Sequence, residues 1–162
     1  MMLTISIFPK DLQFAPSQEA VKATQQLMQQ FFPYPRDYEV EVKQYPKPRF
    51  FTAGLNCESY TCPACSTKTE VDYDDDESWR GFIEAAEEAP DATTHSVTMP
   101  CCKNAVLLPT IKFGRCIFGE TATIARFMIG LADVESALPD EKLAEIEKAL
   151  GCKAIQWLGA GT

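Results

Sequence analysis

Residues 139–158, PDEKLAEIEKALGCKAIQWL, hold the clearest fold signal in the chain. The first half has the pattern of a helix, because its apolar residues recur on one face and Pro139 suits a first helical turn. The residues of that face are Leu143, Ile146 and Leu150. Gly151 then supplies the left-handed residue that ends many helices. Apolar residues predict a strand over 152–158 and another over 124–132, so the end of the chain is predicted to be a strand–helix–strand unit.

The start of the chain repeats this order. Apolar and polar residues alternate over 3–8, which predicts a strand. Ser17 is placed to cap the next helix, because its side-chain oxygen can accept from a free amide of the first turn. The apolar face of that helix consists of Val21, Leu27, Met28 and Phe31. Pro33 and Pro35 end it, and the alternation over 38–43 predicts a strand with one wet face.

Two strand–helix–strand units predict an α+β fold: a ferredoxin-like βαβ…βαβ sandwich with four strands and two helices on one face. A longer doubly wound sheet would need more than two crossover helices. We expect this domain to comprise 1–55 and 120–162, and 56–119 to form an inserted, zinc-ribbon-like subdomain. Within the insert, 97–99 and 105–108 predict a hairpin. A short helix is also expected there, with Trp79, Phe82, Ile83 and Ala86 on one face.

The composition is that of a globular protein. Hydrophobic residues make up 46% and charged residues 23% of the 162 residues, which is normal for a soluble domain. No apolar run approaches the roughly 18 residues that a membrane helix needs. Residues 1–9 lack the basic and apolar segments of a signal peptide. We therefore expect a cytoplasmic protein that does not enter a membrane.

The net charge of −8 argues against a protein that binds the phosphates of a duplex. The basic cluster of Lys43, Lys47 and Arg49 is short and interrupted by prolines. The acidic run 72–77 could dock a basic protein partner, although a solvated loop is the simpler interpretation. Nucleic acid is therefore not the expected partner, and the oligomeric state is left open.

Seven cysteines in a chain without an export signal indicate metal binding or catalysis, because reducing compartments disfavour disulfides. Cys62 and Cys65 form a C-x2-C segment whose sulfurs can both reach one ion at about 2.3 Å. A tetrahedral site needs two more ligands, and Cys101 and Cys102 supply them. Neighbouring residues of a regular strand point to opposite faces, so the backbone must turn at this pair.

The prediction from these four cysteines is one structural Zn²⁺. A closed set of four thiolates leaves no vacant position for water. Structural zinc sites contribute about 10–16 kcal/mol of apparent binding free energy. That energy would fold the insert, whose own apolar content is modest.

Other residues compete for a place in this site. Cys57 could replace one ligand, because only four residues separate it from the C-x2-C segment. His95, the only histidine, could replace Cys101. Cys116 and Cys152 adjoin apolar strand segments and are expected to pack in the core.

Other chemistry of the thiols also stays open. All four could be buried and free, Cys101 and Cys102 could form a vicinal disulfide, or Cys62 and Cys65 could be a redox pair. A thioredoxin-like redox motif opens a helix directly after a strand. The polar, β-branched segment 66–70 does not predict such a helix.

Several segments along most of the chain carry a family resemblance. They are Arg49-Phe50-Phe51, Cys62-Pro63-Ala64-Cys65, Trp79, Pro100-Cys101-Cys102, Ala125-Arg126-Phe127 and Leu150-Gly151-Cys152. Together they resemble a family of small uncharacterised bacterial proteins with a CPxC…CC zinc-knuckle pattern, and the resemblance implies metal binding. Some members are labelled sugar-transporter ATPases, but this chain lacks the G-x-x-x-x-G-K-[ST] loop that cradles phosphates. Glycine usually follows the Cys-Cys pair in this family, whereas Lys103 follows it here.

A non-catalytic binding or adaptor protein is the favoured function, because the sequence shows no nucleophile–base pair and no nucleotide loop. A zinc-dependent hydrolase or deaminase is the alternative, with Glu58 or Glu70 as a base. Zinc deaminases place H-x-E before P-C-x-x-C, whereas His95 follows the C-x2-C segment here.

A nucleic-acid-binding protein is the third hypothesis. An RNA-binding sheet exposes aromatic side chains beside basic residues. Phe50, Phe51 and Trp157 are the candidates, but core packing is the better interpretation of such large apolar groups.

Overall fold

The computed structural model describes residues 3–33, 39–52, 59–70, 76–114 and 121–160, with the backbone alone for 76–80 and 160. The chain divides into two compact units. Unit 1 comprises 1–46 and 125–162, and unit 2 comprises 47–124. The predicted boundaries at 55/56 and 119/120 lie outside the described residues, and the observed divisions at 46/47 and 124/125 fall inside two long strands.

Four strands of the chain form one sheet in the order β2-β8-β1-β9. They are β1 (Leu3–Pro9), β2 (Glu41–Thr52), β8 (Ala122–Val134) and β9 (Ala154–Ala160). Strand β1 pairs antiparallel with both β8 and β9. Its Ile5 and Ile7 are fully buried. Strand β2 lies at an edge, which explains how it can contain Pro46 and Pro48, since an edge strand tolerates residues without an N–H.

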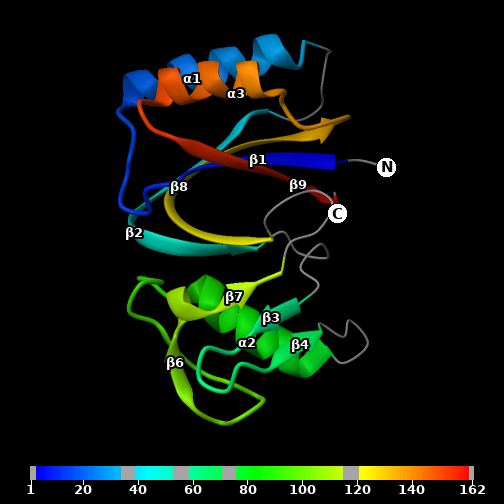
Figure 1. Cartoon of the computed structure of the whole chain (residues 1–162). Helices are drawn as coiled ribbons and strands as arrows, with labels where there is room; N and C mark the ends of the chain where they lie inside the picture. The colour runs from blue at the N-terminus through cyan, green and yellow to red at the C-terminus, as the bar shows by residue number, and fades with distance from the viewer. Residues whose placement is uncertain (1–2, 34–38, 53–58, 71–75, 115–120, 161–162) are drawn as a thin grey trace. The chain divides into compact units, whose positions relative to one another are not determined.

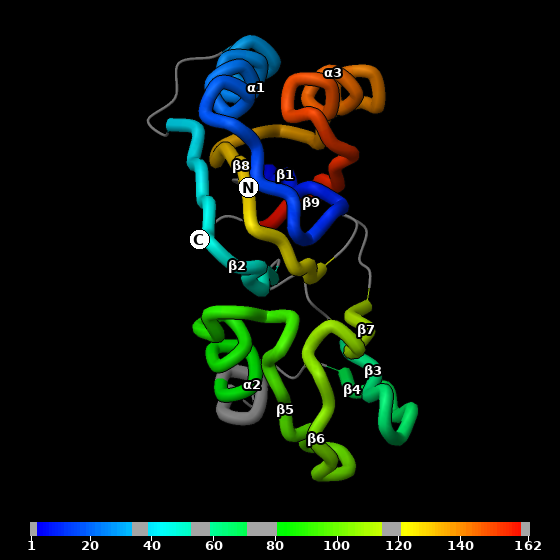
Figure 2. The backbone as a smooth tube through the Cα atoms, turned by 90° about the vertical axis from the view of Figure 1, so that its left-hand side faces the viewer, coloured from blue at the N-terminus to red at the C-terminus, as the bar shows by residue number. Residues whose placement is uncertain are grey.

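Helices α1 (Gln18–Phe31) and α3 (Asp140–Leu150) lie side by side on one face of this sheet (Figures 1 and 2). Each helix presents apolar residues to the core, and Met28 and Ile146 are fully buried. Burial of an amphipathic face is the main source of stability for helices of this length.

The caps of both helices follow the sequence prediction. The Ser17 hydroxyl accepts from the amide of Ala20 at 3.2 Å. Gly151 ends α3 in the left-handed region with φ 89°. The amides of Gly151 and Cys152 both donate to the carbonyl of Glu147. Because the cap uses Cys152, strand β9 begins two residues later than the predicted 152–158.

Unit 2 contains one longer helix and several short strands. They are β3 (Ser59–Thr61), β4 (Lys68–Glu70), α2 (Asp76–Glu88), β5 (Ser96–Thr98), β6 (Ala105–Leu107), the 3-10 turn η2 (Leu108–Thr110) and β7 (Lys112–Phe113). Strands β4-β3-β7 form an antiparallel sheet. Strands β5 and β6 form the predicted hairpin, with Val97 opposite Val106.

Aromatic rings fill the core of unit 2. The Tyr60 and Phe82 rings stack with centroids 5.2 Å apart, and those of Phe50 and Phe113 lie 5.4 Å apart. Offset aromatic pairs add to the energy of simple burial. Cys62, with 1% of its surface exposed, belongs to the same core. The core therefore reaches the cysteine cluster.

The α+β class is confirmed, with three helices and antiparallel strand pairs in the described part of the chain. Phe50 and Trp157 are only 4% and 3% exposed, so both pack in cores as predicted and cannot stack on bases. Phe51 is partly buried in β2. Within the described ranges, no helix is both long and apolar enough to span a bilayer.

Candidate metal centre

Two backbone turns with the same hydrogen-bond pattern bring the cysteines together. The first begins at Cys62, whose carbonyl accepts from the amide of Ser66 at 2.9 Å. The second begins at Met99, whose carbonyl accepts from the amide of Lys103 at 2.9 Å. In each turn, the amide of the first residue also donates to the carbonyl five residues later, at 3.0 Å and 2.9 Å. Proline follows the first residue in both turns. The backbone turn that adjacent ligands require is therefore present.

The last residue of each turn has a left-handed backbone. Ser66 has φ 63° and Lys103 has φ 62°. This region costs a residue with a side chain roughly 1–2 kcal/mol, and glycine is the usual solution. The chain keeps the turn at Lys103 even without glycine.

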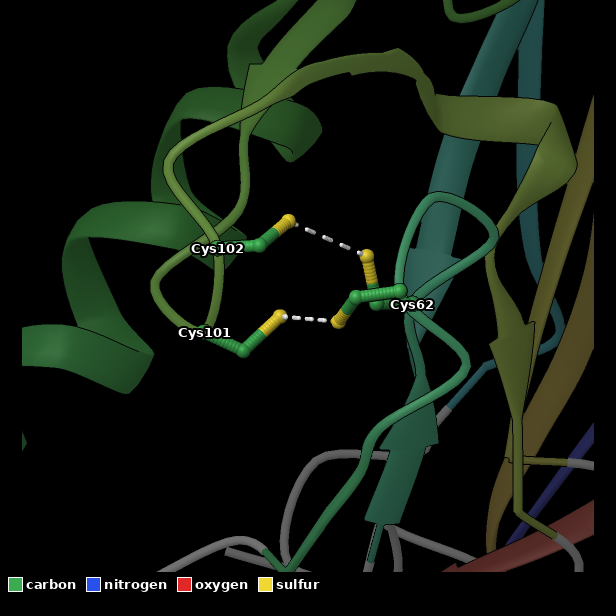
Figure 3. A group of neighbouring side chains, drawn as sticks. Cys62, Cys101 and Cys102 are labelled. Carbon is green, nitrogen blue, oxygen red and sulfur yellow. Dashed lines mark hydrogen bonds between the residues drawn. The ribbon is translucent and has the colours of Figure 1, made fainter.

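The four sulfurs form one compact group. The Cys62 and Cys102 sulfurs are 3.8 Å apart, and those of Cys65 and Cys101 are 3.4 Å apart. All four lie within 4.8 Å of one another. A tetrahedron with Zn–S bonds of about 2.3 Å separates its sulfurs by about 3.8 Å. Figure 3 shows Cys101 and Cys102 on one turn, directed toward Cys62 on the facing turn.

The two turns use different positions for their sulfurs, which explains the unusual Cys-Cys pair. In the first turn, the sulfurs belong to the first and fourth residues, Cys62 and Cys65. In the second turn, Met99 occupies the first position, and Cys101 and Cys102 are the third and fourth residues. The Met99 side chain is fully buried in the core of unit 2. Met99 therefore fills the first position of the second turn with a core side chain. Cys101, at the third position, provides the sulfur that the first residue provides in the other turn.

Hydrogen-bond donors surround the sulfurs. The amide of Ala64 donates to the Cys62 sulfur, and the Asn104 side chain donates to the Cys102 sulfur, both at 3.4 Å. The Thr67 hydroxyl lies 3.1 Å from the Cys65 sulfur. Such contacts orient ligands and stabilise thiolate charge. Thr67 and Asn104 were not predicted as part of the site, because their only signal in the sequence is their place two residues after a cysteine.

Cys65 and Cys101 have opposite electrostatic environments. Hydrogen bonds from the hydroxyl and the backbone amide of Thr67 lower the pKa of Cys65 to about 6. Desolvation, followed by the neighbouring sulfurs, raises the pKa of Cys101 to about 12. Both residues are exposed at the surface, but the Cys101 sulfur faces the cluster. The surroundings therefore favour the thiolate form of Cys65 and the protonated form of Cys101 in the metal-free site.

Zinc affinity is therefore expected to fall as the pH falls. Binding must remove the Cys101 proton, so the apparent affinity should drop at least about tenfold per pH unit between pH 8 and 7. The dependence should steepen below pH 6, where Cys65 also becomes protonated. Competition with a chromophoric chelator at constant ionic strength measures this slope. An affinity that is constant between pH 6 and 8 contradicts the expectation.

Of the other candidate ligands, His95 does not join the group. Among the described residues, the cluster contains four cysteines and neither a histidine nor a carboxylate. His95 is partly buried just before β5, and Glu70 is exposed and paired with Lys68 at 3.7 Å. Cys152 belongs to unit 1, where burial raises its pKa to about 11. Cys57, Glu58, Cys116 and the acidic residues 72–75 lie outside the described residues.

The described cysteines are free thiols, so Cys101 and Cys102 form no vicinal disulfide. Fold and site together define a two-unit α+β protein with a four-cysteine group suited to a metal ion. No family model, no curated protein and no solved structure matches the chain.

Proposed function

We propose that the four cysteines bind one Zn²⁺ as a structural site, and that the protein is a non-catalytic protein-interaction or adaptor module of the cytoplasm. The proposal rests on one observation: four sulfurs from two turns approach within 4.8 Å of one another. Thiolates are soft ligands that suit zinc, and a tetrahedral set of four is typical of structural sites.

The same geometry favours structure over catalysis. A catalytic zinc has three protein ligands and an open position beside a general acid or base. Here four thiolates would fill the coordination sphere. The described cluster includes no histidine or carboxylate that could serve as a base.

We also propose a specific fold type for each of the two units. The strand order β2-β8-β1-β9, with antiparallel pairs and two helices on one face, supports a ferredoxin-like unit 1. Two facing turns above short antiparallel strands support a zinc-ribbon-like unit 2.

Metal analysis tests the zinc proposal. Purified protein is expected to contain about one zinc per chain, and Cys152→Ser, as the matched control, is expected to retain it. Replacement with Co²⁺ should give the absorption of a tetrahedral thiolate site. Added azide should leave that spectrum unchanged, because no position is open. Protein that is metal-free and takes up no zinc contradicts the site, and a spectrum that azide changes contradicts the structural role.

A further inference from the structure

A groove of about 410 Å³ lies beside the Cys101-Cys102 turn, within unit 2. Gly81, Phe82 and Ala85 of helix α2 form one wall, and strand β5 forms the other. Lys103, the last residue of the second turn, also lines the groove. Figure 2 shows β5 between α2 and β6. The groove therefore adjoins the edge of β5 that β6 does not use.

The hydrogen bonds of the hairpin show which backbone groups face this edge. The amide of Met99 donates to the carbonyl of Asn104 at 2.9 Å, and the carbonyl of His95 accepts from the first amide of η2 at 2.9 Å. The odd-numbered residues of this segment, such as His95 and Met99, therefore direct their backbone N–H and C=O groups toward β6. The direction alternates along an antiparallel strand. Ser96 and Thr98 consequently direct their N–H and C=O groups toward the groove.

That edge is available for another strand. Within the described part of the chain, β5 pairs only with β6, in a two-stranded sheet. An open strand edge offers a row of backbone donors and acceptors that match an extended peptide. The neighbouring wall of Gly81, Phe82 and Ala85 is apolar, and two of its three residues, Gly81 and Ala85, are small. It leaves space for side chains of such a peptide.

The charge of the groove indicates the kind of peptide. The protein has a net charge of −8, but the lining side chains that the structure describes include Lys103 and His95 and no carboxylate. Lys103 is exposed. A cation in the lining of the groove favours a carboxylate on the ligand and disfavours a basic one.

We propose that this groove binds an extended acidic peptide of a partner protein, which adds a third strand at the open edge of β5. The inference names a ligand for the proposed adaptor function. It rests on the proposed function because part of the groove belongs to the proposed zinc site. Pro100 and Lys103 of the groove belong to the turn that the metal would hold in place.

Gly81 provides a variant that blocks the groove without weakening the fold. Among the described residues, and apart from its chain neighbours and the backbone of its own helix, a Cβ at this position meets no atom within 4 Å, so a larger side chain points into open space. Leucine is also a better helix former than glycine. Gly81→Leu should therefore fold and occlude the groove. Ser96→Pro removes only an outward N–H, because proline is tolerated at the first residue of an edge strand.

The probe is the blocked hexapeptide Asp-Val-Thr-Val-Thr-Asp, with matched peptides that carry Asn or Lys at both ends. Added to the zinc-loaded protein, the acidic peptide should shift the amide resonances of Ser96 and Thr98 and slow their hydrogen exchange. Affinity should fall from Asp to Asn to Lys. Gly81→Leu and Ser96→Pro should each weaken binding at least about tenfold, and Lys103→Asn should remove the preference for Asp over Asn.

Three outcomes overturn the proposal: no shift at Ser96 and Thr98, equal affinity for the three peptides, or pairing of two copies of the chain through β5 instead. The two proposals can fail separately. Zinc-loaded protein that ignores the peptide contradicts only the docking site. Metal-free protein that still binds it contradicts only the role of zinc.

Discussion

Cys62→Ser is expected to abolish tight zinc binding and to unfold unit 2, while unit 1 keeps its structure. Cys62 is both a proposed ligand and part of the aromatic core. Loss of groups that only support a ligand costs 10–100-fold in metal affinity, so loss of a buried ligand should cost more than about a hundredfold. Structural zinc contributes about 10–16 kcal/mol, as much as the whole stability of a typical domain. Unit 2 should not remain folded without it.

Two other serine variants set the scale for this effect. Cys65→Ser should be milder, because Cys65 is exposed and water can take its place. Cys152→Ser, in unit 1, should keep both zinc and the structure of unit 2. The expected order of damage is therefore Cys62, then Cys65, then Cys152.

Hydrogen exchange measured residue by residue shows whether unit 2 unfolds because the metal is lost or because the packing of Cys62 is lost. Amides of 47–124 should lose protection in Cys62→Ser, and amides of β1, β9, α1 and α3 should keep it. Wild-type protein treated with a strong chelator should show the same pattern. A chelated wild type that keeps full protection while Cys62→Ser unfolds would mean that packing of Cys62, not the ion, stabilises unit 2.

The parts of the fold that the sequence predicts well are those with long periodic segments. Helix α1 begins after its predicted cap Ser17, and α3 ends at its predicted stop Gly151. Strand β2 was predicted only over 38–43, yet it extends from Glu41 to Thr52. Prolines normally end a strand, and Pro46 and Pro48 are tolerated only because β2 lies at an edge. Edge position is a tertiary property that a local pattern does not carry.

The sheet β4-β3-β7 had no sequence signal. Its strands contain three, three and two residues, too few to show a period of two. They form because they pair with each other and cover the aromatic core around Tyr60. Contacts distant in sequence determine such strands.

The four cysteines were chosen from sequence by ligand count and spacing, and the structure places all four in one group. The sequence did not explain why the second pair is adjacent. The matching turns at Cys62 and Met99 explain it. A C-x2-C segment would have its first sulfur at position 99, but the side chain at that position belongs to Met99 and packs in the core. That relation depends on the burial of Met99 and is visible only in three dimensions.

Met99→Ala is therefore expected to weaken zinc binding although Met99 is not a ligand. The side chain is fully buried at the first position of the Cys101-Cys102 turn. Truncation of a buried methionine costs about 2–5 kcal/mol. A turn that has lost its anchor no longer holds both sulfurs in position, so part of that cost should appear as zinc affinity.

Met28→Ala is the matched control, because Met28 is equally buried but lies in helix α1 of unit 1. Both variants should lose comparable stability in denaturant unfolding. Only Met99→Ala should lower zinc affinity, by about tenfold or more, in competition with a chelator. Equal zinc affinity in the two variants would mean that the sulfurs keep their arrangement without the anchor. The turn would then be held by its own backbone hydrogen bonds, and the core and the metal site would be energetically independent.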